Sequence, residues 1–269
     1  MIGHINIPWK NQMLAASIDF PVSFQQGASY PLVIICHGFT GSRIGVDRLF
    51  VKTAQHLNLD QCAVLRFDYA GCGESSGEYG KNGLCELIEQ TEAVIDYAFE
   101  QNALIVEEVF LLGHSLGGAV ALLTAAGDAR VRNLILWSAV ANPDIDIKMI
   151  VGKERLQELS KSCHVDYLGY YLTDNFFNSL EKYKPLTVAR ELTGNVLLIH
   201  GTNDDEIPVE YCRLYEKAFS KRGKGTCQRK EISGANHTFS DAEHFSKLIS
   251  VTRAWIKARK SESSFSDVS

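Results

Sequence analysis

Short runs of apolar residues recur along the chain and predict strands that are buried on both faces. They lie at residues 32–36, 63–67, 109–112, 134–137 and 196–199, with a weaker run at 228–232. Runs rich in Val, Ile and Leu that end at Gly, Asn or Asp are typical of parallel strands covered by crossover helices. Short apolar alternations at residues 11–22 predict, in addition, an antiparallel pair that opens the sheet.

Helical patterns of apolar residues separate these runs. They cover residues 47–57, 84–99, 116–126, 210–220 and 241–259. Strands that alternate with helices along a chain predict an α/β fold with a doubly wound, mostly parallel sheet. The polar, serine-rich stretch at 261–269 is expected to be disordered.

One interval breaks the alternation, because about fifty residues separate the run that ends at Trp137 from the next buried run, and one crossover helix needs far fewer. The interval combines aromatic residues with carboxylates: Tyr167, Tyr170, Tyr171, Phe176, Phe177 and Tyr183 with Asp144, Asp146, Asp166 and Asp174. We interpret it as a cap that folds over the strand ends and encloses a pocket, the alternative being aromatic side chains that only pack helices together. The expected organisation is a core of residues 1–137 and 191–260 with a cap of residues 138–190.

Composition and charge narrow the class of protein. The 269 residues carry 27 basic and 32 acidic side chains, a net charge of −5, and no basic stripe, which argues against a nucleic-acid partner. The start of the chain lacks the layout of a secretory signal and no apolar run is long enough to span a bilayer, so we expect a cytoplasmic protein. The seven cysteines are scattered without a C-x-x-C pair, which favours reduced, mostly buried thiols over a metal site.

The sequence Gly-His-Ser-Leu-Gly at residues 113–117 joins a predicted strand to a predicted helix rich in small residues. Such a turn holds its serine at a strained apex, where glycines let the backbone pass and the hydroxyl is lifted clear of the sheet. Ser115 is therefore predicted to be a nucleophile, against the alternative of an ordinary glycine-rich turn. His114 occupies the variable position of the motif, and its side chain is expected to point away from the reaction.

A serine nucleophile needs a base that takes its proton and a third group that orients the base. His237 follows the last weak strand in Gly-Ala-Asn-His and precedes the terminal helix, so it is our candidate for the base. Asp204, in a loop after a buried strand, is our candidate for the acid, and the order Ser, Asp, His fits an elbow-type hydrolase. Asp205 remains an alternative acid, although it and Glu206 also fit first-turn charges of a helix that begins around Pro208.

Glycines follow a predicted strand end again in His-Gly-Phe-Thr-Gly, residues 37–41. They let a backbone N–H turn toward the space above the sheet, where it stabilises an oxyanion. Phe39 is expected to donate one such N–H and Leu116, just after the nucleophile, the other. His37 and His200 each follow a buried strand and are interpreted as structural, with His200 fixing its loop.

These motifs together resemble the α/β-hydrolase superfamily and, within it, carboxylesterases similar to bacterial cinnamoyl (feruloyl) esterases. The resemblance covers most of the chain and rests on five segments in order, at residues 37–43, 68–75, 113–117, 200–208 and 234–237. It implies an α/β-hydrolase fold with an inserted cap, and a structural role for the Asp68 loop.

The resemblance also implies a catalytic triad of Ser115, His237 and Asp204, and an oxyanion hole formed by the N–H groups of Phe39 and Leu116. In cinnamoyl esterases a cap carboxylate meets the phenolic hydroxyl of the substrate. The sequence does not single out Asp144, Asp146 or another cap carboxylate for that role.

The function that follows is two-step acyl transfer on small to medium acyl or phenolic esters, through a covalent acyl-enzyme and without a metal or organic cofactor. The expected partner is a small-molecule ester, and a homodimer is compatible with the chain. A monoacylglycerol lipase is the nearest alternative and a peptidase a weaker one. From another class comes a catalytically inactive hydrolase fold used as a binding module, whose usual sign is the loss of a triad residue.

Overall fold

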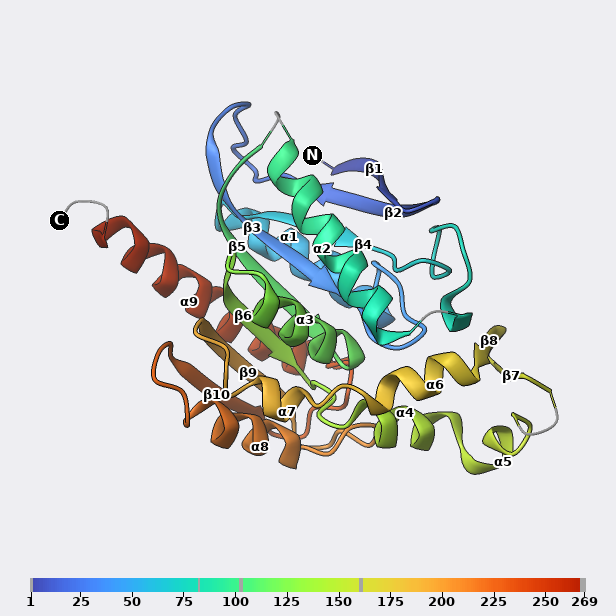
Figure 1. Ribbon diagram of the computed structural model, residues 1–269. Helices are drawn as coiled ribbons and strands as arrows, with labels where there is room; N and C mark the ends of the chain where they lie inside the picture. Colours follow the sequence, from blue (N-terminus) through green and yellow to red (C-terminus); the bar gives the residue numbers. More distant parts are fainter. Residues whose placement is uncertain (1, 82, 102–103, 160–161, 267–269) are drawn as a thin grey trace.

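An eight-stranded, mostly parallel sheet forms the centre of the protein (Figure 1). The computed structural model describes residues 2–81, 83–101, 104–159 and 162–266. The strands of the sheet are β1 (Ile2–Trp9), β2 (Gln12–Asp19), β3 (Ser29–Cys36), β4 (Ala63–Phe67), β5 (Ile105–His114), β6 (Val131–Trp137), β9 (Asn195–Gly201) and β10 (Cys227–Ile232). Their order in space is β1-β2-β4-β3-β5-β6-β9-β10. The β1–β2 and β2–β4 pairs are antiparallel, and the others are parallel.

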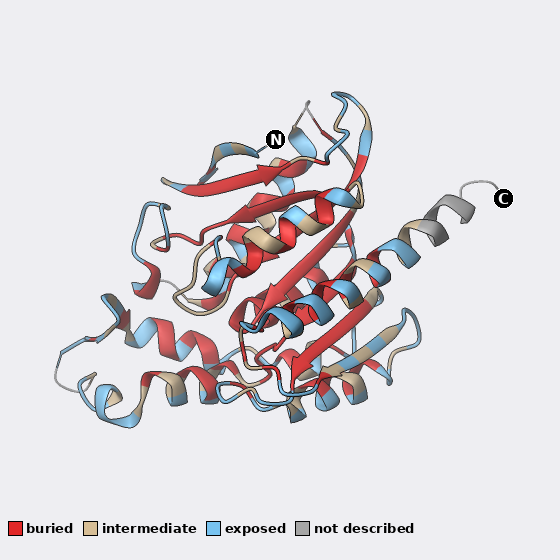
Figure 2. Ribbon diagram, turned by 180° about the vertical axis from the view of Figure 1, so that it is seen from behind, coloured by how far each residue is buried: buried red, intermediate tan, exposed pale blue. Residues whose placement is uncertain are grey.

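Helices cover both faces of the sheet, because the parallel strands are apolar on both sides. They are α1 (Leu49–Leu59), α2 (Leu84–Glu100), α3 (Leu116–Gly127), α8 (Glu210–Phe219) and α9 (Ala242–Ser266). In β3, Leu32 and Ile34 belong to the core shared with α2, α3 and α8, whereas Val33 and Ile35 belong to the core shared with α1 and α9. Figure 2 shows the result, with the middle strands buried along most of their length.

This architecture confirms the predicted α/β fold, and each predicted parallel strand is present. The N-terminal pair is misplaced in the prediction, because it comprises Ile2–Trp9 and Gln12–Asp19 instead of residues 11–22. β1 is an edge strand in which His4 and Asn6 are exposed. The apolar alternation in its sequence covers only Ile5, Ile7 and Trp9, which is a short signal for a strand.

The last helix is longer than the sequence predicted. α9 continues to Ser266, so residues 261–266 are helical where disorder was expected, and residues 267–269 lie outside the described residues. Serine and charged residues give this stretch no apolar period. Extending an existing helix nevertheless adds a hydrogen bond per residue without the cost of nucleation.

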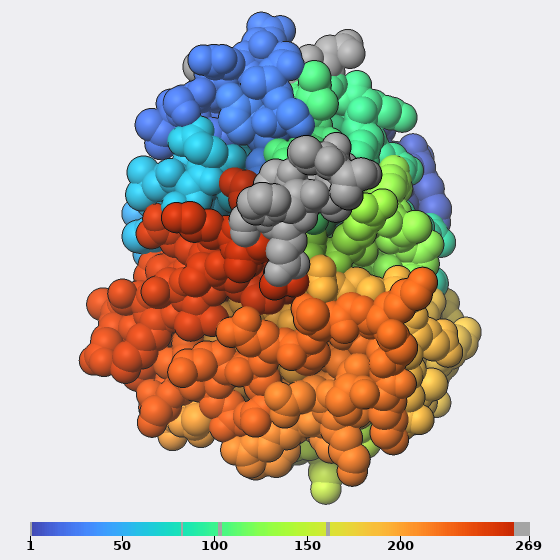
Figure 3. All heavy atoms as spheres, turned by 90° about the vertical axis from the view of Figure 1, so that its left-hand side faces the viewer, coloured from blue at the N-terminus to red at the C-terminus, as the bar shows by residue number. Residues whose placement is uncertain are grey.

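Residues 138–190, which make up most of the segment between β6 and β9, project from the end of the sheet where the parallel strands finish (Figure 1). We call residues 138–190 the cap. Its elements are α4 (Pro143–Val151), α5 (Lys153–Leu156), β7 (His164–Tyr167), β8 (Tyr170–Thr173), α6 (Asp174–Glu181) and α7 (Pro185–Val188). β7 and β8 form a separate antiparallel hairpin. On the opposite side of the molecule, in Figure 3, the chain after β9 (orange to red) forms the lower part of the surface and a segment early in the chain (blue) forms the top.

Candidate active site

Ser115 lies in the turn between β5 and α3, and its backbone is strained. Its φ of 58° and ψ of −126° are unfavourable for a residue with a side chain. A Cβ on Gly113 would collide with the backbone of Gly117, and one on Gly117 would collide with the carbonyl oxygens of Cys36 and His37. The two glycines thus let β3, β5 and α3 approach closely enough to hold Ser115 at the apex. The strand, turn and helix predicted around this serine are present.

His237 and Asp204 are in contact and buried. The Nδ1–H of His237 donates to Oδ2 of Asp204 over 2.8 Å, and the two side chains are 5% and 0% exposed. Since a carboxylate only accepts, this bond places the proton of the neutral ring on Nδ1 and leaves the Nε2 lone pair available. Oδ1 of Asp204 accepts from the backbone N–H groups of Glu206 at 3.0 Å and Ile207 at 2.9 Å.

These hydrogen bonds keep Asp204 ionised. Burial on its own raises the pKa of Asp204, but hydrogen bonds from His200, from His237 and from the N–H of Ile207 lower that pKa well below its usual range. Nε2 of His200 lies 3.1 Å from Oδ2 of Asp204 and 3.0 Å from the carbonyl oxygen of Ile207, so its N–H bridges both acceptors. His200 therefore holds its loop, as predicted, and it also touches the carboxylate itself, which the sequence did not reveal.

The other two acidic residues of this loop have different surroundings. Asp205 is exposed, and within the described part of the chain no ion pair joins it to His237. Glu206 precedes α8, which begins at Glu210, so its interpretation as a first-turn charge is wrong. Its Oε2 lies 3.8 Å from Nε2 of His237. The sequence feature that could have placed Glu206 at the site is its position in the loop after a buried strand. A residue in that loop lies at the same edge of the sheet as Asp204.

The loop after β3 brings the backbone of Phe39 above Ser115. A Cβ added to the neighbouring Gly38 would meet Cβ of Ser115 at 3.0 Å. The carbonyl oxygen of Gly38 accepts from Nδ1–H of His37 at 2.8 Å and from the N–H of Gly41 at 3.1 Å. In a trans peptide the C=O and N–H point in opposite directions, so these bonds turn the N–H of Phe39 away from His37.

Further contacts hold this loop in place. Nε2 of His37 accepts the N–H of Tyr69 at 3.1 Å, so both ring nitrogens are used and burial lowers the pKa of His37. The buried carboxylate of Asp68 accepts the backbone N–H of Arg43 at 2.5 Å and pairs with its guanidinium. Leu116 is the first residue of α3, where a backbone N–H has no acceptor within the helix.

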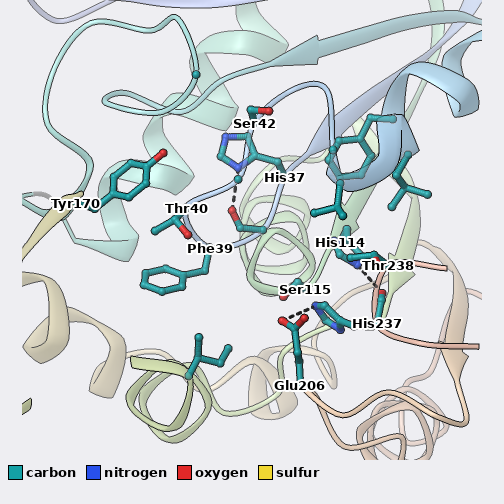
Figure 4. A pocket seen from close by; sticks show the side chains of 18 of the residues that line it. His37, Phe39, Thr40, Ser42, His114, Ser115, Tyr170, Glu206, His237 and Thr238 are labelled. Carbon is teal, nitrogen blue, oxygen red and sulfur yellow. Dashed lines mark hydrogen bonds and ion pairs between the residues drawn. The ribbon is translucent and has the colours of Figure 1, made fainter. Parts of the chain in front are cut away.

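A cavity of about 610 Å³ opens beside Ser115 and His237 (Figure 4). Its wall comes from the loop after β3, from the start of α1, from the loops that carry Glu206 and His237, and from Ile150, Tyr167 and Tyr170 of the cap. In Figure 4 the Ser115 hydroxyl and the His237 ring lie close together, with Glu206 beside them. Among the described residues no hydrogen bond joins the side chains of Ser115 and His237. Such bonds often tighten only when substrate binds.

Aromatic rings connect the cap to the loop after β3. The Phe39 ring centroid lies 5.3 Å from that of Tyr167 in β7 and 5.9 Å from that of Phe176 in α6. Tyr167 and Tyr170 line the cavity, whereas Phe176 and Phe177 are buried in the core. Both interpretations of the aromatic-rich interval therefore apply, to different residues.

Asp144 and Asp146 are engaged elsewhere in the cap. Asp146 is buried, and it accepts from the hydroxyl of Tyr211 at 2.8 Å and from the N–H of Asn142 at 3.0 Å. Asp144 forms an ion pair with Lys148 at 2.5 Å. Neither lines the cavity beside Ser115.

His114 does not point away from the site, so that prediction is wrong. Its Nε2–H donates to the carbonyl oxygen of His237 over 2.9 Å, and the two ring centroids are 4.7 Å apart. It also forms part of the cavity wall. Burial, with the His237 ring as a second cause, lowers the pKa of His114 to about 3. The motif suggested a turn residue, but β5 extends through His114, and the alternation of the strand directs the side chain toward His237.

Comparisons with known sequences identify the family of the chain. A family model described as alpha/beta hydrolase fold matches residues 31–160. The chain is 34% identical over 266 residues to an uncharacterized 31.7 kDa protein of the traX-finO intergenic region of Escherichia coli, across 85% of this chain and 91% of that protein. It is 28% identical over 113 residues to the lysophosphatidylserine lipase ABHD12 of Danio rerio, across 42% of this chain and 27% of that protein.

A solved structure is similar over nearly the whole chain. Est1E from Butyrivibrio proteoclasticus, with ferulic acid bound, superposes with a TM-score of 0.83 at 25% identity, across 96% of this chain and 99% of that chain. No helix in the described part of the chain combines the length and apolar character needed to cross a membrane. The chain therefore belongs to the α/β-hydrolase family, and it is esterase-like in structure.

Proposed function

We propose that the chain is a serine carboxylic-ester hydrolase with a catalytic triad of Ser115, His237 and Asp204. The observation that carries the proposal is the buried 2.8 Å hydrogen bond between His237 and Asp204, beside the cavity that Ser115 also lines. A base for serine needs its ring oriented by a carboxylate at one nitrogen while the other nitrogen faces the reacting groups. The strained backbone of Ser115 suits a nucleophile held clear of the sheet.

In the proposed reaction, Oγ of Ser115 attacks the ester carbonyl carbon while Nε2 of His237 takes the hydroxyl proton. The N–H groups of Phe39 and Leu116 stabilise the oxyanion that forms. The imidazolium of His237 then protonates the leaving alkoxide, the alcohol departs and an acyl-serine remains. His237 next takes a proton from water as the water oxygen attacks the acyl carbon. The acid is released when Ser115 regains its proton, and the steps use no metal or organic cofactor.

The substrates that we propose are small to medium acyl esters and phenolic esters of the cinnamoyl type. Phe39, Tyr167 and Tyr170 line the cavity and offer aromatic surfaces against which a phenolic acyl group can pack. A volume of about 610 Å³ lies within the range of small-molecule sites. The similarity to Est1E with ferulic acid bound supports the same class.

A monoacylglycerol lipase is the second candidate. The chain is similar to a lysophosphatidylserine lipase over part of its length. Its cap also exposes large apolar side chains, Ile145, Met149 and Leu168, which favour contact with lipid chains. A catalytically inactive binding module is the alternative from another class.

Labelling with a fluorophosphonate tests the proposed nucleophile. We expect the wild type to be modified at Ser115 and the Ser115→Ala variant to stay unlabelled. Ser42→Ala is the matched control, because Ser42 lines the same cavity and has no catalytic role in the proposal. His237→Ala should reduce turnover on the order of 10⁴-fold. A wild type that neither labels nor hydrolyses an activated ester would leave the binding module as the better explanation.

A panel of esters then separates the two enzymatic candidates. Short-chain aryl esters, methyl ferulate and monoacylglycerols differ in the shape and polarity of the acyl group. A kcat/KM that is highest for methyl ferulate or short aryl esters supports the carboxylesterase. A clear preference for long-chain monoacylglycerols supports the lipase instead.

A further inference from the structure

Glu206 places a carboxylate next to the nitrogen that moves protons in the proposed reaction. Its Oε2 lies 3.8 Å from Nε2 of His237, and its side chain is 52% exposed. It is the only acidic residue on the wall of the cavity beside Ser115, counting the described residues alone. The mechanism gives this carboxylate no part in proton transfer, because Asp204 already orients the ring through Nδ1.

The position of Glu206 relates it to the alcohol part of the ester. Nε2 of the base must come within hydrogen-bonding distance of the leaving oxygen in order to protonate it. A carboxylate 3.8 Å from Nε2 therefore stands near the start of the alcohol chain. The Glu206 carboxylate therefore interacts most directly with a charge on the alcohol part of the ester.

No lysine or arginine of the described residues balances this charge at the cavity wall, where the basic groups are the imidazoles of His37, His114 and His237. The residues that line the cavity include no Lys or Arg. Arg155 of α5 lies over the Tyr167 ring, 5.7 Å from its centroid, and is not ion-paired with Glu206 in the described chain. Burial raises the pKa of Tyr167, the negative charge of Glu206 raises it further, and the positive charge of Arg155 lowers it.

The aromatic residues of the wall act in the same direction as the carboxylate. Phe39, Tyr167 and Tyr170 present rings to the cavity, and the faces of aromatic rings attract cations. One carboxylate together with the rings of Phe39, Phe50, Tyr167 and Tyr170, and without a lysine or arginine, is a surface that suits an ammonium group.

We propose that Glu206 makes the site selective for esters whose alcohol part carries a positive charge, and that it disfavours alcohols that carry an anion. This inference rests on the proposed esterase function and names a substrate class for it. Because Glu206 is half exposed, solvent screens its charge, and the expected preference for a cationic over a neutral alcohol is about two- to fivefold in kcat/KM. The preference should weaken as salt is added, since ions screen exposed charges over about 10 Å.

The test compares three esters of one acyl group that differ only in the charge of the alcohol. They are the choline ester, its neutral isostere in which carbon replaces nitrogen, and the sulfoethyl ester. The wild type is compared with Glu206→Gln, which removes the charge and keeps the shape. Glu210→Gln is the matched control, because Glu210 is exposed at the start of α8 and does not line the cavity.

We expect kcat/KM of the wild type to fall from choline to neutral to sulfoethyl ester, mainly through KM. In Glu206→Gln the three values should converge on one another, whatever change in rate the three esters share, and Glu210→Gln should behave as the wild type. Equal values for the three esters in the wild type, or an unchanged order in Glu206→Gln, would overturn the inference. Hydrolysis of the neutral ester in that case leaves the esterase proposal standing, whereas hydrolysis of none of the three, with no fluorophosphonate labelling, removes both.

Discussion

Replacing His114 with glutamine should make the stability of the protein less sensitive to acid. His114 is buried, its Nε2–H donates to the carbonyl oxygen of His237 over 2.9 Å, and its pKa is lowered to about 3, first by burial. The amide nitrogen of a glutamine can supply a donor in a similar position but does not titrate. The His114→Gln variant therefore removes the titration and retains the hydrogen bond.

The direction in which pH changes the stability follows from the pKa of His114 in the unfolded and the folded state. An unfolded histidine has a pKa of about 6.5, so below that pH the unfolded chain binds a proton at residue 114 that the folded protein excludes. The free energy of unfolding of the wild type therefore falls as the pH falls from about 6.5 toward about 3. Between about pH 7.5 and pH 5, this single group lowers the free energy of unfolding by about 2 kcal/mol. The figure changes little for any folded pKa below about 4, because the unfolded state then takes up nearly all of the protons.

The assay is urea unfolding of the wild type and of His114→Gln at several pH values between about 5 and 7.5. The titratable groups that the two proteins share cancel in the difference between their unfolding free energies. That difference should shift by about 2 kcal/mol across the range, in favour of the variant at acid pH. A difference that stays constant to within about 0.5 kcal/mol would refute the assignment of His114 as a buried neutral histidine.

Two further substitutions test the acid and the elbow. Asp204→Asn should lower kcat by about 10⁴-fold, because the amide disturbs the hydrogen bond from Nδ1–H of His237. Asp205→Asn should change kcat by less than about threefold. Equal losses for the two variants in steady-state kinetics would contradict Asp204 as the acid. Gly117→Ala should destabilise the fold by about 1–3 kcal/mol in urea unfolding, since its methyl group would meet backbone carbonyl oxygens at the end of β3, and wild-type stability would show that β3 and α3 are not in close contact there.

The parts of the site that the sequence located are those governed by local structure. The Ser115 elbow was found because strand, strained turn and helix are adjacent in the chain and need glycine at Gly113 and Gly117. Asp204 and His237 were singled out as candidates because each follows a strand, and the ends of parallel strands meet at one edge of the sheet. The sequence favoured Asp204 over Asp205 as the acid but left Asp205 as an alternative. The side-chain direction that brings Asp204 to His237 depends on the turn in which Oδ1 accepts two backbone N–H groups.

The parts that the sequence missed depend on contacts between distant segments. His114 and His237 are 123 positions apart, and no local pattern shows that one ring donates to the backbone of the other. Glu206 looked like a helix charge until α8 was seen to begin at Glu210. The helical end of α9 was missed for a related reason, because a helix already formed can extend through residues that would not start one.

The sequence by itself determined the order of elements, the doubly wound sheet and the identity of the candidate nucleophile, base and acid. Apolar period and turn geometry are short-range properties, and the rule that parallel strands end at one edge carries them to the site. Only the tertiary structure decided which groups surround that site: the cap rings beside Phe39, the imidazoles of His114 and His200, and the carboxylate of Glu206. The electrostatics of a cavity depend on what packing brings within a few ångströms, and separation along the chain does not encode that distance.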